Sequence, residues 1–129
     1  MKKISLLGAT GSIGLQTIDI ILANQHEFKL VALSSGRNIE KTREIITKLQ
    51  PEVVSVQEES DALALAKEFP SVQFTYGNKG LVEVATHPET TVLVNAVLGS
   101  VGLESTLAAI RMGKTIAIAN KETLVTAGH

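Results

Sequence analysis

The chain has 129 residues, with 12 lysines and arginines, 13 acidic residues and no cysteine. This length predicts one domain with a hydrophobic core. A net charge of −1 and an aromatic content of 3% argue against a nucleic-acid-binding surface. The lack of cysteine excludes disulfides, zinc–thiolate sites and thiol nucleophiles. No stretch is long enough to span a membrane and the chain does not start with a signal peptide, so we expect a cytoplasmic protein.

Short hydrophobic runs alternate along the chain with segments of helical periodicity. We expect strands at residues 3–7, 28–33, 53–56, 72–75, 91–95 and 115–119. We expect helices from Gly14 to about Asn24, from a cap at Asn38 to the residue before Pro51, from Ser60 to Phe69, from about Asn78 to His87 and from Leu103 to Met112. In these expected strands, hydrophobic residues do not alternate with polar ones. Such continuous hydrophobic runs are typical of a parallel sheet covered on both faces. The predicted fold class is therefore α/β, with a doubly wound parallel sheet.

Three glycines at a spacing of three follow the first strand and lead into the first helix. Gly8 would allow a tight reversal, Gly11 would let a pyrophosphate approach the backbone, and Gly14 would let the helix pack closely. The free N–H groups at the helix start would attract an anion, with the hydroxyls of Thr10 and Ser12 as further donors. An ordinary strand–turn–helix corner is the alternative. The glycine segment stands at the head of a repeating β–α pattern, and this position favours a Rossmann-like dinucleotide-binding domain.

The end of the second strand bears on the type of cofactor. Many NAD-binding proteins have an acidic residue there that holds the ribose hydroxyls, whereas this chain has Arg37 in a Ser-Ser-Gly-Arg-Asn loop. A guanidinium and hydroxyls suit a 2′-phosphate, so the loop favours NADP over NAD. A solvated loop cation is the alternative for Arg37.

Polar residues also follow the fifth and sixth strands. The glycine-containing loop at 95–102 either borders a nicotinamide or is a simple connection. Asn120, Lys121 and Glu122 suit either amide and phosphate recognition or a helix cap with solvated charges. The three histidines are far apart in sequence and lack metal-ligand spacing, and we interpret His87 as a helix end.

A second group of acidic residues has a structural interpretation. Glu58, Glu59 and Asp61 lie around an expected helix start. Negative charge at that position interacts favourably with the helix dipole. We therefore expect these three carboxylates to support the helix rather than to carry chemistry.

Four segments together point to a family: residues 8–14 (GATGSIG), 36–38 (GRN), 99–103 (GSVGL) and 119–125 (ANKETLV). In this order and at these intervals, they resemble the 1-deoxy-D-xylulose 5-phosphate reductoisomerase family over the whole chain. The first segment is common among dinucleotide-binding folds, whereas the last is much more specific.

The resemblance implies an enzyme of non-mevalonate isoprenoid biosynthesis. Such an enzyme rearranges 1-deoxy-D-xylulose 5-phosphate, a sugar phosphate, and reduces the product with NADPH to 2-C-methyl-D-erythritol 4-phosphate. It uses Mg²⁺ or Mn²⁺, and the full-length enzyme is expected to be a homodimer. By matching positions, the resemblance assigns NADPH contacts to Thr10, Gly11, Ser12, Ile13, Gly36, Arg37, Asn38, Asn120 and Glu122. It assigns a substrate contact to Lys121.

The chain departs from the family in one respect. The family binds its metal through an Asp-Ser-Glu segment that follows this region, and the chain lacks that segment. We therefore expect residues 1–129 to form the NADPH-binding domain, without a metal site, a complete catalytic site or the carboxy-terminal domains, and to be inactive alone. Two alternatives stay open: the cofactor domain of another two-domain NAD(P) reductase, such as one of the dihydrodipicolinate or homoserine pathways, and a non-catalytic nucleotide-sensing domain.

Overall fold

The computed structural model describes residues 1–96 and 103–118 of the chain. The strands are β1 (Lys2–Leu7), β2 (Phe28–Ser34), β3 (Val53–Val56), β4 (Gln73–Tyr76), β5 (Val92–Asn95) and β6 (Thr115–Ile118). The helices are α1 (Ser12–Ala23), α2 (Ile39–Leu49), α3 (Glu59–Glu68), α4 (Gly77–Ala85) and α5 (Leu103–Arg111). The expected order of elements is therefore confirmed. Ser60 was expected to open a helix, which is wrong, because α3 begins at Glu59 after the extended residue Glu58.

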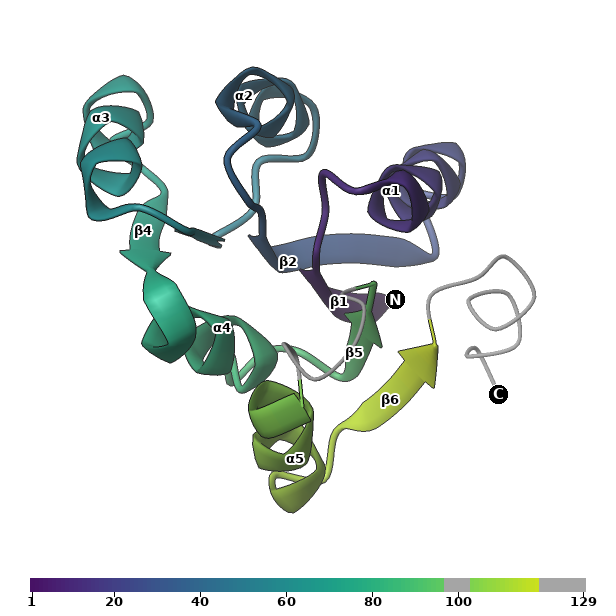
Figure 1. The fold of residues 1–129 in the computed structure, drawn as a ribbon. Helices are drawn as coiled ribbons and strands as arrows, with labels where there is room; N and C mark the ends of the chain where they lie inside the picture. The colour runs from purple at the N-terminus through teal and green to yellow at the C-terminus, as the bar shows by residue number, and fades with distance from the viewer. Residues whose placement is uncertain (97–102, 119–129) are drawn as a thin grey trace.

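The strands form one six-stranded sheet in the order β4-β3-β2-β1-β5-β6, and every neighbouring pair is parallel (Figure 1). The chain moves outward from β1 to β4, and α4 then returns it to the other side of β1, where β5 pairs. The direction of winding therefore changes beside β1. In open parallel sheets, ligands bind beyond the carboxyl ends of the strands at such a switch point.

Helices cover both faces of the sheet. Figure 1 shows α1, α2 and α3 on one face and α4 and α5 on the other. The buried side chains form two clusters accordingly. One contains Ile18 and Ile21 of α1, and the other contains Val84 and Ala85 of α4. Because strand residues are buried on both sides, the strands read as continuous hydrophobic runs, and the predicted doubly wound α/β class is confirmed.

The helix boundaries follow from local chemistry. Asn38 caps α2, because its side-chain oxygen accepts a hydrogen bond from the Lys41 N–H at 3.2 Å. Gly113 follows α5 with a φ of +78°, a conformation that glycine adopts without strain. Both boundaries were predicted from the residue types.

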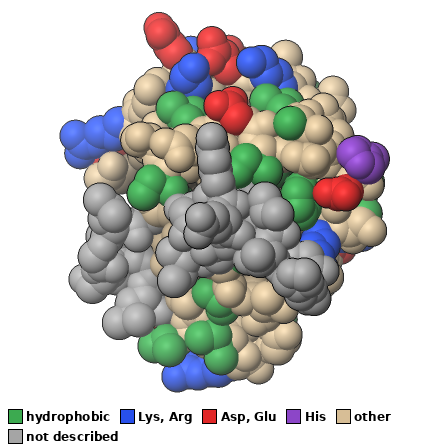
Figure 2. Space-filling model, turned by 90° about the vertical axis from the view of Figure 1, so that its right-hand side faces the viewer, with side chains coloured by type: hydrophobic (Ala, Val, Ile, Leu, Met, Phe, Trp, Pro, Cys, Tyr) green, Lys and Arg blue, Asp and Glu red, His purple; other side chains and the backbone are tan. Residues whose placement is uncertain are grey.

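The surface carries charges of both signs. Figure 2 shows acidic and basic side chains interspersed over the face it presents, with hydrophobic side chains between them. On α5, Leu107 and Ile110 are exposed hydrophobic residues. Among the helices of residues 1–96 and 103–118, none has both the length and the hydrophobicity that a membrane span requires.

Candidate functional site

The glycine turn joins β1 to α1 with the geometry that its sequence predicts. Gly8 has a φ of +84°, which permits the sharp reversal after the strand. A Cβ at Gly14 would overlap the carbonyl oxygen of Gly8 and lie 2.8 Å from the carbonyl carbon of Ala9. A Cβ at Gly11 would meet no atom closer than 3.8 Å. Gly14 is therefore required for the close approach of α1 to the turn, whereas Gly11 leaves the backbone open on its outer side.

The start of α1 presents free backbone donors. Gly11 precedes the helix in an extended conformation, and among the described residues no side chain caps the first turn. The N–H groups of a first helical turn lack partners within the helix and lie at the positive end of its dipole. Ser12 and Ile13 belong to this turn and are exposed. This turn is therefore suited to bind an anion.

A cleft of about 480 Å³ lies at the carboxyl ends of the strands, next to the glycine turn. It is lined by Gly8, Thr10, Gly11, Ser34, Ser35, Gly36, Ser55, Val56, Gln57, Gly77, Asn78, Leu81 and Ala96. The cleft thus joins the glycine turn, the ends of β2, β3 and β5, and the start of α4. Its position at the switch point agrees with the rule for open parallel sheets.

The loops after β1 and β2 are bonded to each other at the mouth of this cleft. The N–H of Gly8 donates to the Ser34 hydroxyl at 3.0 Å, and the N–H of Ala9 donates to the Ser34 carbonyl at 2.8 Å. The Thr42 hydroxyl of α2 donates to the Ser35 hydroxyl at 3.0 Å. Ser34 therefore fixes the relative position of the two loops, and Ser35 ties the loop after β2 to α2.

The described residues of the predicted NADPH site fall into two groups. Thr10, Gly11 and Gly36 line the cleft. Ser12, Ile13, Arg37 and Asn38 lie beside it, at the starts of α1 and α2, and are exposed. Asn120, Lys121, Glu122 and the loop at 97–102 lie outside the described residues.

The structure adds a wall that the sequence analysis did not identify. Ser55, Val56 and Gln57 contribute from the end of β3, and Gly77 and Asn78 contribute from the start of α4. The signal that could have found them is simple, because each set lies where a parallel strand ends. The sequence predicted site residues after the first, second, fifth and sixth strands, and none after the third and fourth.

Tyr76, the last residue of β4, adjoins this wall. Its hydroxyl donates a hydrogen bond of 2.8 Å to the Glu59 carboxylate. This hydrogen bond, with the negative charge of Glu59, raises the pKa of Tyr76. Tyr76 is therefore tied to the start of α3 beside this wall.

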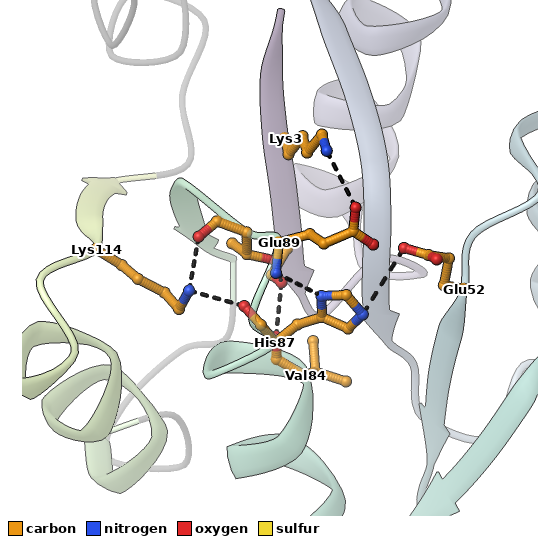
Figure 3. Close-up of polar contacts among 8 residues, drawn as sticks. Lys3, Glu52, Val84, His87, Glu89 and Lys114 are labelled. Carbon is orange, nitrogen blue, oxygen red and sulfur yellow. Dashed lines mark hydrogen bonds and ion pairs between the residues drawn. The ribbon is translucent and has the colours of Figure 1, made fainter.

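The opposite end of the sheet, where the strands begin, holds a second polar cluster (Figure 3). The ligand-type atoms of Glu52, His87 and Glu89 lie within 4.8 Å of one another. Lys3 Nζ lies 3.1 Å from a Glu89 carboxylate oxygen, and Lys114 Nζ donates to the carbonyls of His87 and Thr90 at 2.7 and 2.6 Å. His87 follows α4, as its interpretation as a helix end predicts.

The hydrogen bonds of His87 indicate that this cluster is structural. Its Nδ1 accepts from the backbone N–H of Glu89 at 3.1 Å, so the neutral ring carries its proton on Nε2. That nitrogen points to Glu52, whose carboxylate oxygen is 3.8 Å away (Figure 3). A metal at Nε2 would have to displace this proton while Nδ1 accepts its present bond. The cluster therefore ties the loop before β5 to its neighbours.

Taken together, the switch-point cleft, the glycine turn and the uncapped helix define a Rossmann-like α/β domain of the dinucleotide-binding class. Comparison with known proteins identifies the family. A family model described as 1-deoxy-D-xylulose 5-phosphate reductoisomerase matches residues 4–128. The chain belongs to this family, as the resemblance in its sequence predicted.

Several relatives align with the entire chain. It is 77% identical to the 1-deoxy-D-xylulose 5-phosphate reductoisomerase of Lysinibacillus sphaericus (strain C3-41) and 60% identical to that of Listeria welshimeri serovar 6b, in each case over 129 residues. These residues are 34% of the length of either relative. The chain therefore spans about one third of the curated relatives that it matches.

Solved structures of the family share the fold. The reductoisomerase of Zymomonas mobilis, in complex with NADPH, matches 98% of this chain with a TM-score of 0.82 and 36% identity, over 34% of its own length. A reductoisomerase in complex with fosmidomycin and magnesium matches 98% of this chain with a TM-score of 0.85 and 31% identity, over 32% of its own length. The agreement extends over nearly all of the chain.

Proposed function

We propose that this chain binds NADPH and forms the cofactor-binding part of a 1-deoxy-D-xylulose 5-phosphate reductoisomerase. The observation that carries the proposal is the cleft at the carboxyl ends of the strands, bounded by the glycine turn and the uncapped start of α1. A pyrophosphate is well stabilised by such a helix start. The proposal is supported by the relative from Zymomonas mobilis, which was solved with NADPH. The family match favours this interpretation over the two alternatives left open by the sequence.

The pyrophosphate would bind at the first turn of α1. The backbone N–H groups of Ser12 and Ile13 would donate to its oxygens, and the Thr10 hydroxyl would add a donor from the cleft wall. The backbone of Gly11 would allow close approach, since its outer side is open. This arrangement needs no positive side chain, because the charge complementarity comes from the helix.

The 2′-phosphate would bind at the loop after β2. Gly36 lines the cleft, Arg37 supplies a guanidinium, and Asn38 keeps its side-chain N–H₂ for donation because only its oxygen caps α2. Asn120 and Glu122 are predicted to contact the nicotinamide end, and Lys121 the sugar phosphate. When bound, NADPH would supply a hydride to the substrate.

The divalent metal of the full-length enzyme has to lie near the substrate to polarise its carbonyl. Within the described residues, the cluster with ligand-like spacing is Glu52, His87 and Glu89, which lies at the opposite end of the sheet from the cleft and does not suit this role. We therefore do not propose this cluster as the site of Mg²⁺ or Mn²⁺, and the resemblance assigns the metal ligands to an Asp-Ser-Glu segment that residues 1–129 do not contain. A sugar-phosphate substrate, a homodimeric full-length enzyme and a cytoplasmic location belong to the same proposal.

Calorimetric titration of the chain with NADPH and NADH tests the proposal. NADPH is expected to bind more tightly than NADH. A charge-assisted contact contributes about 1–2 kcal/mol, so Arg37→Ala should reduce the ratio of the two affinities by roughly 5- to 30-fold. Arg43→Ala is the matched control, because Arg43 is an arginine of α2 that is paired with Glu68 away from the cleft. Equal affinities for the two cofactors in the wild-type chain would contradict the proposal.

A further inference from the structure

Arg37 is paired with an acidic residue beside the cleft. Its Nη2 lies 3.3 Å from a carboxylate oxygen of Glu58, and both side chains are well exposed. Arg37 follows β2 and Glu58 follows β3, so the pair bridges two neighbouring loops at the carboxyl end of the sheet. Their immediate neighbours, Gly36 and Gln57, line the cleft. The ion pair therefore lies at the rim of the candidate cofactor site.

The pairing affects how the guanidinium can receive a phosphate. A phosphate binds arginine best through two parallel N–H donors, and Nη2 already faces the Glu58 carboxylate. A phosphate that arrives has to displace this carboxylate or share the guanidinium with it. Sharing brings two anions close together, at a separation shorter than the Debye length of about 8 Å at physiological salt. In either case Glu58 opposes the binding of a phosphate at Arg37.

The neighbouring acidic residues do not change this conclusion. Glu59 is engaged by the Tyr76 hydroxyl at 2.8 Å, and Asp61 lies in the first turn of α3. Both favour the start of α3 through its dipole. Glu58 is the acidic residue of this group that the structure brings to Arg37.

We propose that Glu58 competes with the cofactor's 2′-phosphate for Arg37 and thereby limits the discrimination between NADPH and NADH. This inference rests on the proposed function and extends it to a residue outside the predicted NADPH site. Glu58 acts through Arg37 and is not a catalytic residue. NADH lacks the 2′-phosphate, so its binding leaves the ion pair intact.

A second arginine–glutamate pair provides a matched comparison. Arg43 Nε of α2 lies 2.8 Å from a carboxylate oxygen of Glu68 of α3, and both side chains are exposed, as in the first pair. Glu68 is the last residue of α3, whereas Glu58 directly precedes its first turn, next to the cleft. Exposed ion pairs contribute little to stability, so removal of either carboxylate should leave the fold intact. The two pairs differ in their distance from the cofactor site.

The test compares Glu58→Gln with Glu68→Gln by calorimetric titration of the 129-residue chain with NADPH and NADH. Glu58→Gln should tighten NADPH binding about two- to fivefold and leave NADH binding unchanged, the size expected for an exposed ion pair. The gain should shrink at about 1 M salt, where the Debye length is about 3 Å. Glu68→Gln should change neither affinity.

The double variant shows whether Glu58 acts through Arg37. In an Arg37→Ala background, Glu58→Gln should have a much smaller effect on NADPH affinity than in the wild type. If the ratio of NADPH affinity to NADH affinity in Glu58→Gln is the same as in the wild type or lower, the inference is overturned and the proposed function still stands. A wild-type chain that does not bind NADPH would overturn both.

Discussion

At the amino end of the sheet, polar side chains are bonded to one another and to backbone carbonyls, whereas at the carboxyl end several donors and hydroxyls face a cleft. Lys3 and Lys114 are both engaged at the amino end, by Glu89 and by two carbonyls respectively. At the carboxyl end, the first turn of α1 has no side-chain cap. Among the described residues, the hydroxyls of Ser55 and Thr75 also have no hydrogen-bond partner, and both are buried against Gly80 of α4.

This difference separates a structural end of the molecule from a functional one. Buried or partly buried polar groups that satisfy each other stabilise the fold and leave nothing to offer a ligand. Groups without internal partners cost stability and can be satisfied by a ligand instead. The His87 cluster has the residue types of a metal site, yet its bonds are internal. The glycine turn has few side chains, yet it presents the donors.

The largest expected effect comes from Gly14 at the carboxyl end. Gly14→Ala should lower the free energy of unfolding by about 3 kcal/mol or more, because its Cβ would overlap the Gly8 carbonyl oxygen and backbone cannot move aside as a flexible side chain can. Thermal and urea unfolding, monitored by circular dichroism, measures the change. Gly11→Ala is the control and should cost far less, since its Cβ would be in ordinary contact. Equal losses for the two variants would refute the assignment of close packing to Gly14.

The next effect lies at the amino end. Lys114→Met removes two hydrogen bonds from an ammonium to the carbonyls of His87 and Thr90, and should cost about 2 kcal/mol of unfolding free energy. Lys29→Met, at an exposed position of β2, should change stability little. If both variants unfold at the same urea concentration as the wild type, the lysine does not stabilise this end of the sheet.

The same lysine gives the amino end a pH dependence. Burial lowers the pKa of the Lys114 ammonium, so the folded chain loses this proton at a lower pH than the unfolded chain. Between the two pKa values the unfolded chain binds more protons, and the free energy of unfolding therefore rises with pH. The stability difference between wild type and Lys114→Met should widen as pH rises from 7 toward the ordinary pKa of lysine. Urea unfolding of both at several pH values checks this, and a constant difference would contradict it.

The sequence predicted the elements whose causes are local. The glycine turn, the cap at Asn38 and the helix end at Gly113 each depend on residues within a few positions of one another. The parallel sheet was predictable because strands buried on both faces are continuously hydrophobic. The error at Ser60 has a local cause too, since no side-chain cap fixes the start of α3 and its acidic residues resemble one another.

Contacts between distant segments could not be predicted in this way. Glu52 and His87 are separated by 35 positions, and they meet because β3 and β5 begin at the same end of the sheet. Arg37 and Glu58 meet because the ends of β2 and β3 are neighbours. The sequence predicted that Arg37 binds a phosphate and that Glu58 supports a helix start, but the strand order was needed to bring the two residues together.

The smallest expected effect has the opposite sign. It compares two buried serines: Ser5, in the middle of β1 and bonded to the segment before β5, and Ser55, near the carboxyl end of β3. Ser5 of β1 donates to the Val84 carbonyl at 2.6 Å and shares a hydrogen bond of 2.6 Å with Thr90, so Ser5→Ala should cost about 1 kcal/mol. Ser55 of β3 is equally buried, and within the described residues its hydroxyl has no partner. Ser55→Ala removes a polar group whose burial is uncompensated, and should leave stability unchanged or raise it by up to about 1 kcal/mol. Urea unfolding of the two variants measures both changes. A loss for Ser55→Ala as large as that for Ser5→Ala would mean that the Ser55 hydroxyl is satisfied as well as the Ser5 hydroxyl, and the distinction between a structural and a functional end would fail at this position.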